Sequence, residues 1–193
     1  MNKFILFLAK FVCSASFMLS GVQPYESILP IDYVPYNLEE PWIIYNQVNN
    51  QQTTVFIDVK SVNGAVSRYI AANTNSTVNI FNINPWRSSE NAFQEFLSNV
   101  IQENQTNRIT PIRMDSSEAC EALNLVSECI YIEADPDNVY ADIIAWSSHL
   151  APHGVIMGNH WDWSDVVIQV TRSATLLHMS VSVSGDYWIL KKH

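Results

Sequence analysis

The hydrophobic pattern of residues 53–193 alternates between short β-type runs and stretches with helical spacing. Runs rich in β-branched and aromatic residues predict buried strands at 54–59, 77–83, 109–114, 129–134 and 154–158. Between them, helical spacing of apolar residues predicts helices at 64–73, 88–102, 116–123, 138–150 and 164–177. Two further β runs, 180–184 and 187–190, are joined at Gly185-Asp186, a pair suited to a tight hairpin turn. The pattern predicts an α/β fold, with a seven-stranded, mostly parallel sheet, an antiparallel last strand and helices on both faces.

Helix-capping residues are visible at two of these starts. Ser88 or Ser89 is expected to cap the helix at 88–102, which carries the clearest apolar stripe. Asp115 is a possible cap for the short helix at 116–123.

Residues 22–52 differ from the rest because they carry four prolines, followed by the polar run Asn49-Asn50-Gln51-Gln52. We interpret this part as an irregular lead-in with one short helix near 42–48. The domain itself is expected to span residues 53–193.

The first 21 residues have the features of a signal peptide. A basic start at Met1-Asn2-Lys3 precedes an apolar run over 4–20, and small residues at 13–15 and 20–21 suit cleavage. The run is shorter than the roughly 20 apolar residues of a membrane-spanning helix, and Lys10 interrupts it. We expect export to the periplasm or beyond, with membrane contact only through this segment if it is uncut. The alternative is an amphipathic N-terminal helix on a cytoplasmic protein.

Composition narrows the function classes. Hydrophobic residues make up 48% of the 193 positions and charged ones 15%, which is typical of one globular domain. A formal charge of −9 argues against nucleic acid as the partner, because phosphate backbones are repelled. The chain has only five glycines and no P-loop. After cleavage Cys120 and Cys129 would remain, either as a disulfide or as two free thiols.

An open, mostly parallel sheet binds its ligands beyond the carboxyl ends of its strands, where the strand order reverses. The candidate site residues are therefore those that directly follow the predicted strands. In the last of these segments Trp161 and Trp163 are candidates for an aromatic pocket wall, the alternative being that at least one packs at the edge of the core. Tyr131 and Trp146 are expected in the core.

Residues 131–163, YIEADPDNVYADIIAWSSHLAPHGVIMGNHWDW, resemble the corresponding region of small class I S-adenosylmethionine-dependent methyltransferases of the small-molecule O-methyltransferase type. The matching positions on the helix and the following strand are Asp142, Trp146, Gly154, Val155, Gly158 and Trp161. Residues 82–86 (NINPW) and 186–190 (DYWIL) resemble the family's second-strand end and last strand. The resemblance covers about residues 54–190 and implies a Rossmann-like methyltransferase fold.

The resemblance implies an S-adenosylmethionine site built from the ends of the first three strands. Lys60 stands where the family has its first glycine, and Asn84 replaces the acid that binds the ribose hydroxyls. The amide offers one acceptor and one donor group, a weaker fit to a diol than a carboxylate. The implied cofactor-binding residues are Asp58, Lys60, Gly64, Asn84, Trp86, Asp115 and Ser116.

The resemblance also places catalysis at the ends of the fourth and fifth strands. Glu133 and His160 are the implied catalytic residues, with His160 either a general base or a solvated loop histidine. Metal-dependent relatives hold magnesium here, so the implied ligands are Glu133, Asn159 and His160. This set is a poor oxygen cage for magnesium, so a divalent metal is doubtful. Pro136 stands at the family's usual histidine.

Two functions of different class follow. The chain is either a methyltransferase that acts on an oxygen of a small-molecule acceptor, or a catalytically inactive relative. The inactive form would be an exported binding or interaction module with a protein partner. The altered positions at Lys60, Asn84, Pro136 and the Asn159-His160 pair motivate the second hypothesis.

Overall fold

The computed structural model describes Tyr25, Ile28 and residues 31–192. The predicted signal peptide lies outside the described residues. Within the described part, no helix combines the length and the apolar character needed to cross a membrane.

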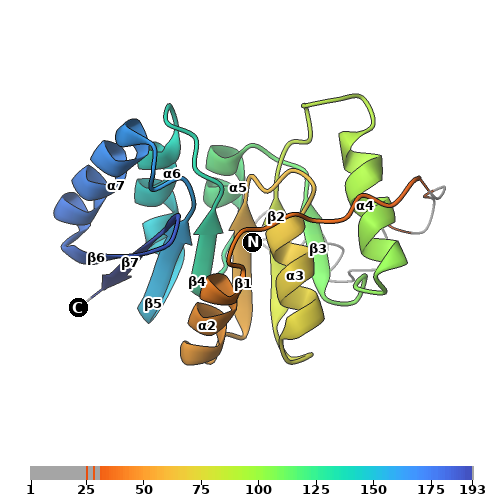
Figure 1. Ribbon diagram of the computed structural model, residues 1–193, viewed down its shortest axis with the longest axis horizontal. Helices are drawn as coiled ribbons and strands as arrows, with labels where there is room; N and C mark the ends of the chain where they lie inside the picture. Colours follow the sequence, from red (N-terminus) through yellow and green to blue (C-terminus); the bar gives the residue numbers. More distant parts are fainter. Residues whose placement is uncertain (1–24, 26–27, 29–30, 193) are drawn as a thin grey trace, which may run out of the picture.

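The core of the molecule is one seven-stranded sheet with the order β3-β2-β1-β4-β5-β7-β6 (Figure 1). The strands are β1 (Val55–Val59), β2 (Asn79–Ile83), β3 (Ile109–Ile112), β4 (Ser127–Ile132), β5 (Leu150–Gly158), β6 (Met179–Ser184) and β7 (Tyr187–Lys192). The first five pair in parallel, whereas β7 runs antiparallel to both β5 and β6. The predicted fold class is confirmed, including the hairpin at Gly185-Asp186.

Helices cover both faces of the sheet, as the helical spacings between strands predict. They are α2 (Trp42–Asn50), α3 (Ala65–Asn73), α4 (Ala92–Gln102), α5 (Ser116–Ala122), α6 (Val139–Trp146) and α7 (Ser164–Leu177), with a 3₁₀ turn η2 (Ser147–His149). Apolar side chains of α2, α3 and α4 pack in one cluster, and those of α5, α6 and α7 pack in another. Successive residues of β1 enter opposite clusters, with Phe56 in the first and Ile57 in the second, because strand side chains alternate.

The start of α4 corrects one prediction. The helix begins at Ala92 with Asn91 at its N-cap position, so neither Ser88 nor Ser89 caps it. The preceding residues form a turn that brings Phe93 against Trp86, with ring centroids 4.8 Å apart. The first turn of α4 therefore carries a tertiary contact with the residues that follow β2.

One expected capping bond and one further boundary differ from the sequence pattern. Asp115 occupies the N-cap position of α5 but makes no capping hydrogen bond, because its carboxylate pairs with Arg87. The helix expected over 138–150 ends at Trp146, and Leu150 already belongs to β5.

Cys120 and Cys129, the cysteines within the described residues, are free thiols. Cys129 is buried in β4 and Cys120 is half-buried on α5. Of the two alternatives for this pair, a disulfide or two free thiols, the structure therefore contains the two free thiols.

Residues 31–41 of the lead-in are irregular up to α2, as predicted, and they cross the molecule as the orange-red segment of Figure 1. Arg68 of α3, whose side chain is fully buried, fastens it: the guanidinium donates to the Val34 carbonyl at 3.0 Å. The rings of Tyr33 and Tyr36 lie 5.3 Å from the same group. Further along, Tyr187 donates to the Glu39 carbonyl at 2.7 Å. The lead-in is thereby held beside the β6–β7 hairpin.

Candidate functional site

The strand order reverses between β1 and β4, the position at which open α/β sheets bind ligands. The loop 60–64 follows β1, and the segment 133–138 follows β4. All of the predicted site residues lie at or beside this carboxyl edge, in two groups.

The first group begins at the loop after β1. Lys60 and Gly64 both have a left-handed backbone, with φ of 72° and 67°. Gly64 needs to be glycine for a second reason, since a Cβ there would collide with the Phe96 ring. Lys60 adopts a glycine-like conformation at a cost of roughly 1–2 kcal/mol. The loop thus keeps the backbone shape of a glycine turn without its first glycine.

The Lys60 side chain extends towards α6. Its Nζ lies 2.6 Å from Oδ2 of Asp142, a largely buried carboxylate. The other oxygen of Asp142 accepts the Ser116 hydroxyl at 2.6 Å, and the Trp146 indole donates to Ser116 Oγ at 2.9 Å. Lys60 and Ser116, both predicted cofactor residues, are therefore joined through Asp142.

Asn84 and Trp86 close onto the same loop from β2. The Asn84 amide donates to the Lys60 carbonyl at 2.9 Å, and its oxygen accepts the Trp86 N–H at 2.7 Å. The Trp86 indole donates to the Val62 carbonyl at 2.7 Å and is 2% exposed. Both groups of the Asn84 amide are thus engaged within the protein.

Asp58 is fully buried in a polar network below the loop. One of its oxygens accepts the Ser67 N–H at 2.9 Å, the Ser67 hydroxyl at 2.5 Å and the Asn82 amide at 3.0 Å. Burial raises the pKa of Asp58 to about 7, while these hydrogen bonds oppose the increase. Asp58 therefore joins β1, β2 and α3, whereas Asp115 faces solvent beside Arg87.

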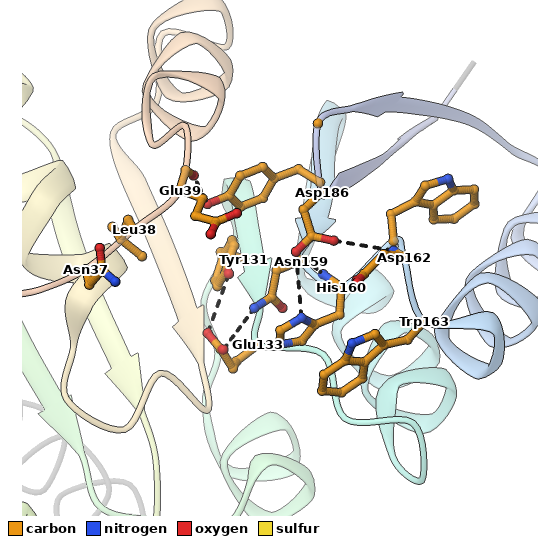
Figure 2. A pocket seen from close by; sticks show the side chains of 13 residues that line it. Asn37, Leu38, Glu39, Tyr131, Glu133, Asn159, His160, Asp162, Trp163 and Asp186 are labelled. Atoms are coloured by element: carbon orange, nitrogen blue, oxygen red, sulfur yellow. Dashed lines mark hydrogen bonds and ion pairs between the residues drawn. The ribbon is translucent and has the colours of Figure 1, made fainter.

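The second group of residues surrounds a cavity of about 690 Å³ at the ends of β4 and β5 (Figure 2). The lead-in and the β6–β7 hairpin complete its wall. The lining residues are Asn37, Leu38, Glu39, Tyr131, Glu133, Asn159, His160, Trp161, Asp162, Trp163, Gly185, Asp186 and Tyr187. We call this space the β4–β5 cavity.

Glu133 is positioned in the cavity by Asn159. The Asn159 amide donates to Glu133 Oε1 at 2.9 Å, while its oxygen accepts the Ala134 N–H at 2.8 Å. The Tyr131 hydroxyl lies 3.5 Å from Glu133 Oε2. Glu133 and Asn159, two of the three implied metal ligands, are thus hydrogen-bonded to each other. The side-chain oxygen of Asn159 is used by a backbone N–H.

His160 is held by the hairpin. Its backbone is left-handed, with φ of 61°, and its N–H donates to Asp186 Oδ2 at 2.9 Å. Its Nδ1 lies 3.7 Å from the same oxygen, and its ring stacks on Trp163 at 3.9 Å between centroids. Side-chain atoms of His160, Asp162 and Asp186 all lie within 4.8 Å of one another. His160 therefore belongs with these two acids rather than with Asn159.

Both tyrosines of the cavity keep their protons. Burial, followed by the neighbouring Glu133 carboxylate, raises the pKa of Tyr131 well above its ordinary value. Burial, followed by Asp186 and Glu133, raises the pKa of Tyr187 to about 12. The phenols are neutral at physiological pH, and the field of the cavity is negative.

The structure gathers Glu133, Asn159 and His160 in one place, and it places Trp161 and Trp163 on the same wall. Tyr131 is in the core, as expected, but it also lines the cavity. The sequence analysis did not identify Glu39, Asp186 or Tyr187 as site residues. Asp186 and Tyr187 had only the hairpin turn and the resemblance of residues 186–190 to a last strand as sequence signals, which predict a conformation and no partner, and Glu39 had no sequence signal.

Comparison with known proteins identifies a family whose model matches the chain. The model of a family described as a methyltransferase domain matches residues 61–161. No curated protein sequence matches the chain.

Among solved structures, an O-methyltransferase from Bacillus cereus in complex with SAH superposes with a TM-score of 0.63 at 17% identity, covering 92% of this chain and 91% of that one. A methyltransferase from Geobacter sulfurreducens gives a TM-score of 0.66 at 10% identity, covering 81% and 80%. The O-methyltransferase TomG from Streptomyces achromogenes in complex with SAM gives 0.63 at 12% identity, covering 91% and 87%. These likenesses establish a shared fold.

Proposed function

The chain belongs to the methyltransferase domain family, and on this premise we propose that it transfers a methyl group from S-adenosylmethionine to an oxygen of a small molecule held in the β4–β5 cavity. The observation that carries the proposal is the cavity itself. It brings Glu133 and His160 together at the carboxyl edge, next to the loop that follows β1.

The loop after β1 fits the amino-acid end of the cofactor. Among the described residues, the backbone N–H groups of Ser61, Val62 and Asn63 donate no hydrogen bond. Successive free N–H groups in a turn suit a carboxylate. S-adenosylmethionine, when bound, supplies a methyl group on a positively charged sulfur.

The residues that follow β2 do not fit the ribose of the cofactor. Both polar groups of Asn84 are used by Lys60 and Trp86, and the side chain is 5% exposed. A ribose diol would gain a partner only after Asn84 releases one of these bonds. We therefore expect weaker cofactor binding than an acid at this position would give.

The protein's own contribution to the reaction is to position the acceptor and remove its proton. Glu133 and His160 line the same cavity, and each can accept a proton from an acceptor hydroxyl. Asp186 Oδ2 lies 3.7 Å from Nδ1 of His160, so the carboxylate stands beside the imidazole that faces the acceptor. No step is assigned to a metal on Glu133, Asn159 and His160, because the Asn159 oxygen faces the Ala134 N–H and the other two residues do not form an oxygen cage.

A second candidate function is favoured by the Lys60–Asp142 ion pair and the closed Asn84. In this alternative the chain keeps the fold, has lost the reaction and acts as a binding or interaction module outside the cytoplasm. In that case the contacts of Lys60 and Asn84 that close the cofactor site would persist, because no cofactor would displace them.

Calorimetric titration with S-adenosylmethionine and S-adenosylhomocysteine, with and without magnesium, separates the two. Micromolar binding, about −8 kcal/mol, supports the enzyme. The absence of binding heat from a folded sample supports the inactive relative. The double variant Lys60→Gly, Asn84→Asp removes the crowding side chain and restores an acid. Binding that appears only in this variant identifies those two positions as the cause of the loss.

A further inference from the structure

We propose that the β4–β5 cavity selects a ligand that carries an ammonium group, so that the methyl acceptor is an organic cation. This rests on the proposed function only in taking the cavity as the acceptor site. The selection for positive charge follows from the lining residues and does not need a bound cofactor.

The charged groups of the lining have one sign. Four carboxylates, those of Glu39, Glu133, Asp162 and Asp186, face a cavity that no lysine or arginine lines. Only His160 is able to offset them, and it lies beside Asp186. A cation is attracted to such a space, and an anion is repelled from it.

Tyr131 supplies a second observation that points to a ligand. Its side chain is 1% exposed, yet its hydroxyl reaches the cavity, and Glu133 is its nearest recorded partner, at 3.5 Å. That separation exceeds the roughly 2.5–3.0 Å of an O–H···O hydrogen bond. Burial of a polar group without a short partner is costly. An ammonium group can donate to both oxygens at once and also compensates the negative charge of Glu133, which a neutral donor does not do.

Aromatic rings complete the wall (Figure 2). The His160 and Trp163 rings stack in parallel, and Trp163 belongs to the lining together with Tyr187. A ring face attracts a cation within about 6 Å of its centre. Carboxylates combined with ring faces are a chemistry that recognises organic ammonium groups in preference to small hydrated ions.

Three probes of matched shape test the charge preference: tyramine, para-ethylphenol and phloretate, which carry a positive, no and a negative charge. Each is titrated into the full chain without added cofactor, and the dissociation constants are compared. We expect tyramine to bind about tenfold tighter than para-ethylphenol and phloretate to bind least. Equal affinity for the three, or tighter binding of phloretate, overturns the proposal.

Two variants locate the selection in the cavity. Asp162→Asn and Glu39→Gln each remove one lining carboxylate whose side chain makes no recorded bond, so the fold is expected to be unaffected. Each should weaken tyramine binding several-fold and leave para-ethylphenol unchanged. Glu121→Gln on α5 makes the same change in net charge away from the lining and is the matched control. If the control weakens tyramine as much as the cavity variants do, the preference comes from the overall negative charge and the proposal fails.

The outcomes for the two proposals are distinguishable. Tyramine selectivity without cofactor binding rejects the methyltransferase function and retains the cation site. Cofactor binding without charge selectivity retains the methyltransferase function and rejects the cation site.

Discussion

At the scale of single residues, Asp58 makes the clearest prediction. Its pKa is about 7 in the folded protein and near 3.8 when exposed, so folding is coupled to retention of a proton. The stabilising contribution is complete below the unfolded pKa and is lost as the pH rises through the folded one. Over that window the free energy of unfolding should fall by up to about 4 kcal/mol.

Urea unfolding of the native protein and of Asp58→Asn at several pH values measures this contribution. Asparagine is isosteric, keeps an acceptor for Ser67 and does not titrate, so the variant should lose most of the fall in stability between about pH 4 and pH 7. The same pH dependence in both proteins would show that other groups are responsible.

At the scale of elements, the fastening of the lead-in depends on Arg68. The guanidinium is buried, bonds to the Val34 carbonyl and pairs with Glu103 of the turn after α4. Arg68→Met should cost about 3–5 kcal/mol, because it leaves the largely buried Glu103 carboxylate with the Tyr33 hydroxyl but without its paired cation. Hydrogen exchange of residues 31–39 should accelerate, and tyramine affinity should fall, since Asn37 to Glu39 line the cavity.

The matched control for this variant is Arg87→Met. Arg87 also pairs with a carboxylate, that of Asp115, but its side chain is 74% exposed. An exposed pair of this kind contributes at most about 1 kcal/mol. If the two variants cost the same, Arg68 does not fasten the lead-in in the way we describe.

The local sequence pattern was sufficient to predict those helices and strands whose ends are determined by neighbouring residues in the chain. The predicted helix at 164–177 coincides with α7, because its apolar stripe is uninterrupted and a left-handed His178 follows it. The hairpin was predictable because Gly185-Asp186 specifies a turn. The start of α4 was not, since Trp86 and Phe93 set it by tertiary packing.

The candidate site was predictable only in part, for the same reason. Glu133 and His160 directly follow strands, so position in the chain indicated them. Glu39 enters the cavity through a contact with Tyr187, 148 positions away, that no local pattern contains. The Lys60–Asp142 pair likewise joins the loop after β1 to helix α6, 82 positions further along the chain.

At the scale of the whole molecule, the candidate site residues at the carboxyl edge of the sheet lie in two halves, for which we propose separate functions. The loop after β1, with Asn84, forms one half, and the β4–β5 cavity forms the other. Many of the described hydrogen bonds join residues within the same half. Asn84, in the first half, makes no described hydrogen bond to a residue that lines the cavity. Variants in one half should therefore leave binding in the other unchanged.

This separation predicts opposite signatures for two substitutions. His160→Ala should lower turnover by about a hundredfold or more through loss of the proton acceptor, with cofactor affinity unchanged. Asn84→Asp should strengthen cofactor binding and leave the affinity for tyramine as it is. Calorimetry with each ligand, together with turnover measured at saturating cofactor, provides both comparisons. If His160→Ala abolished cofactor binding, or Asn84→Asp changed tyramine affinity, the two halves would have to act as one site, and the assignment of cofactor and acceptor to separate sides of β4 would be wrong.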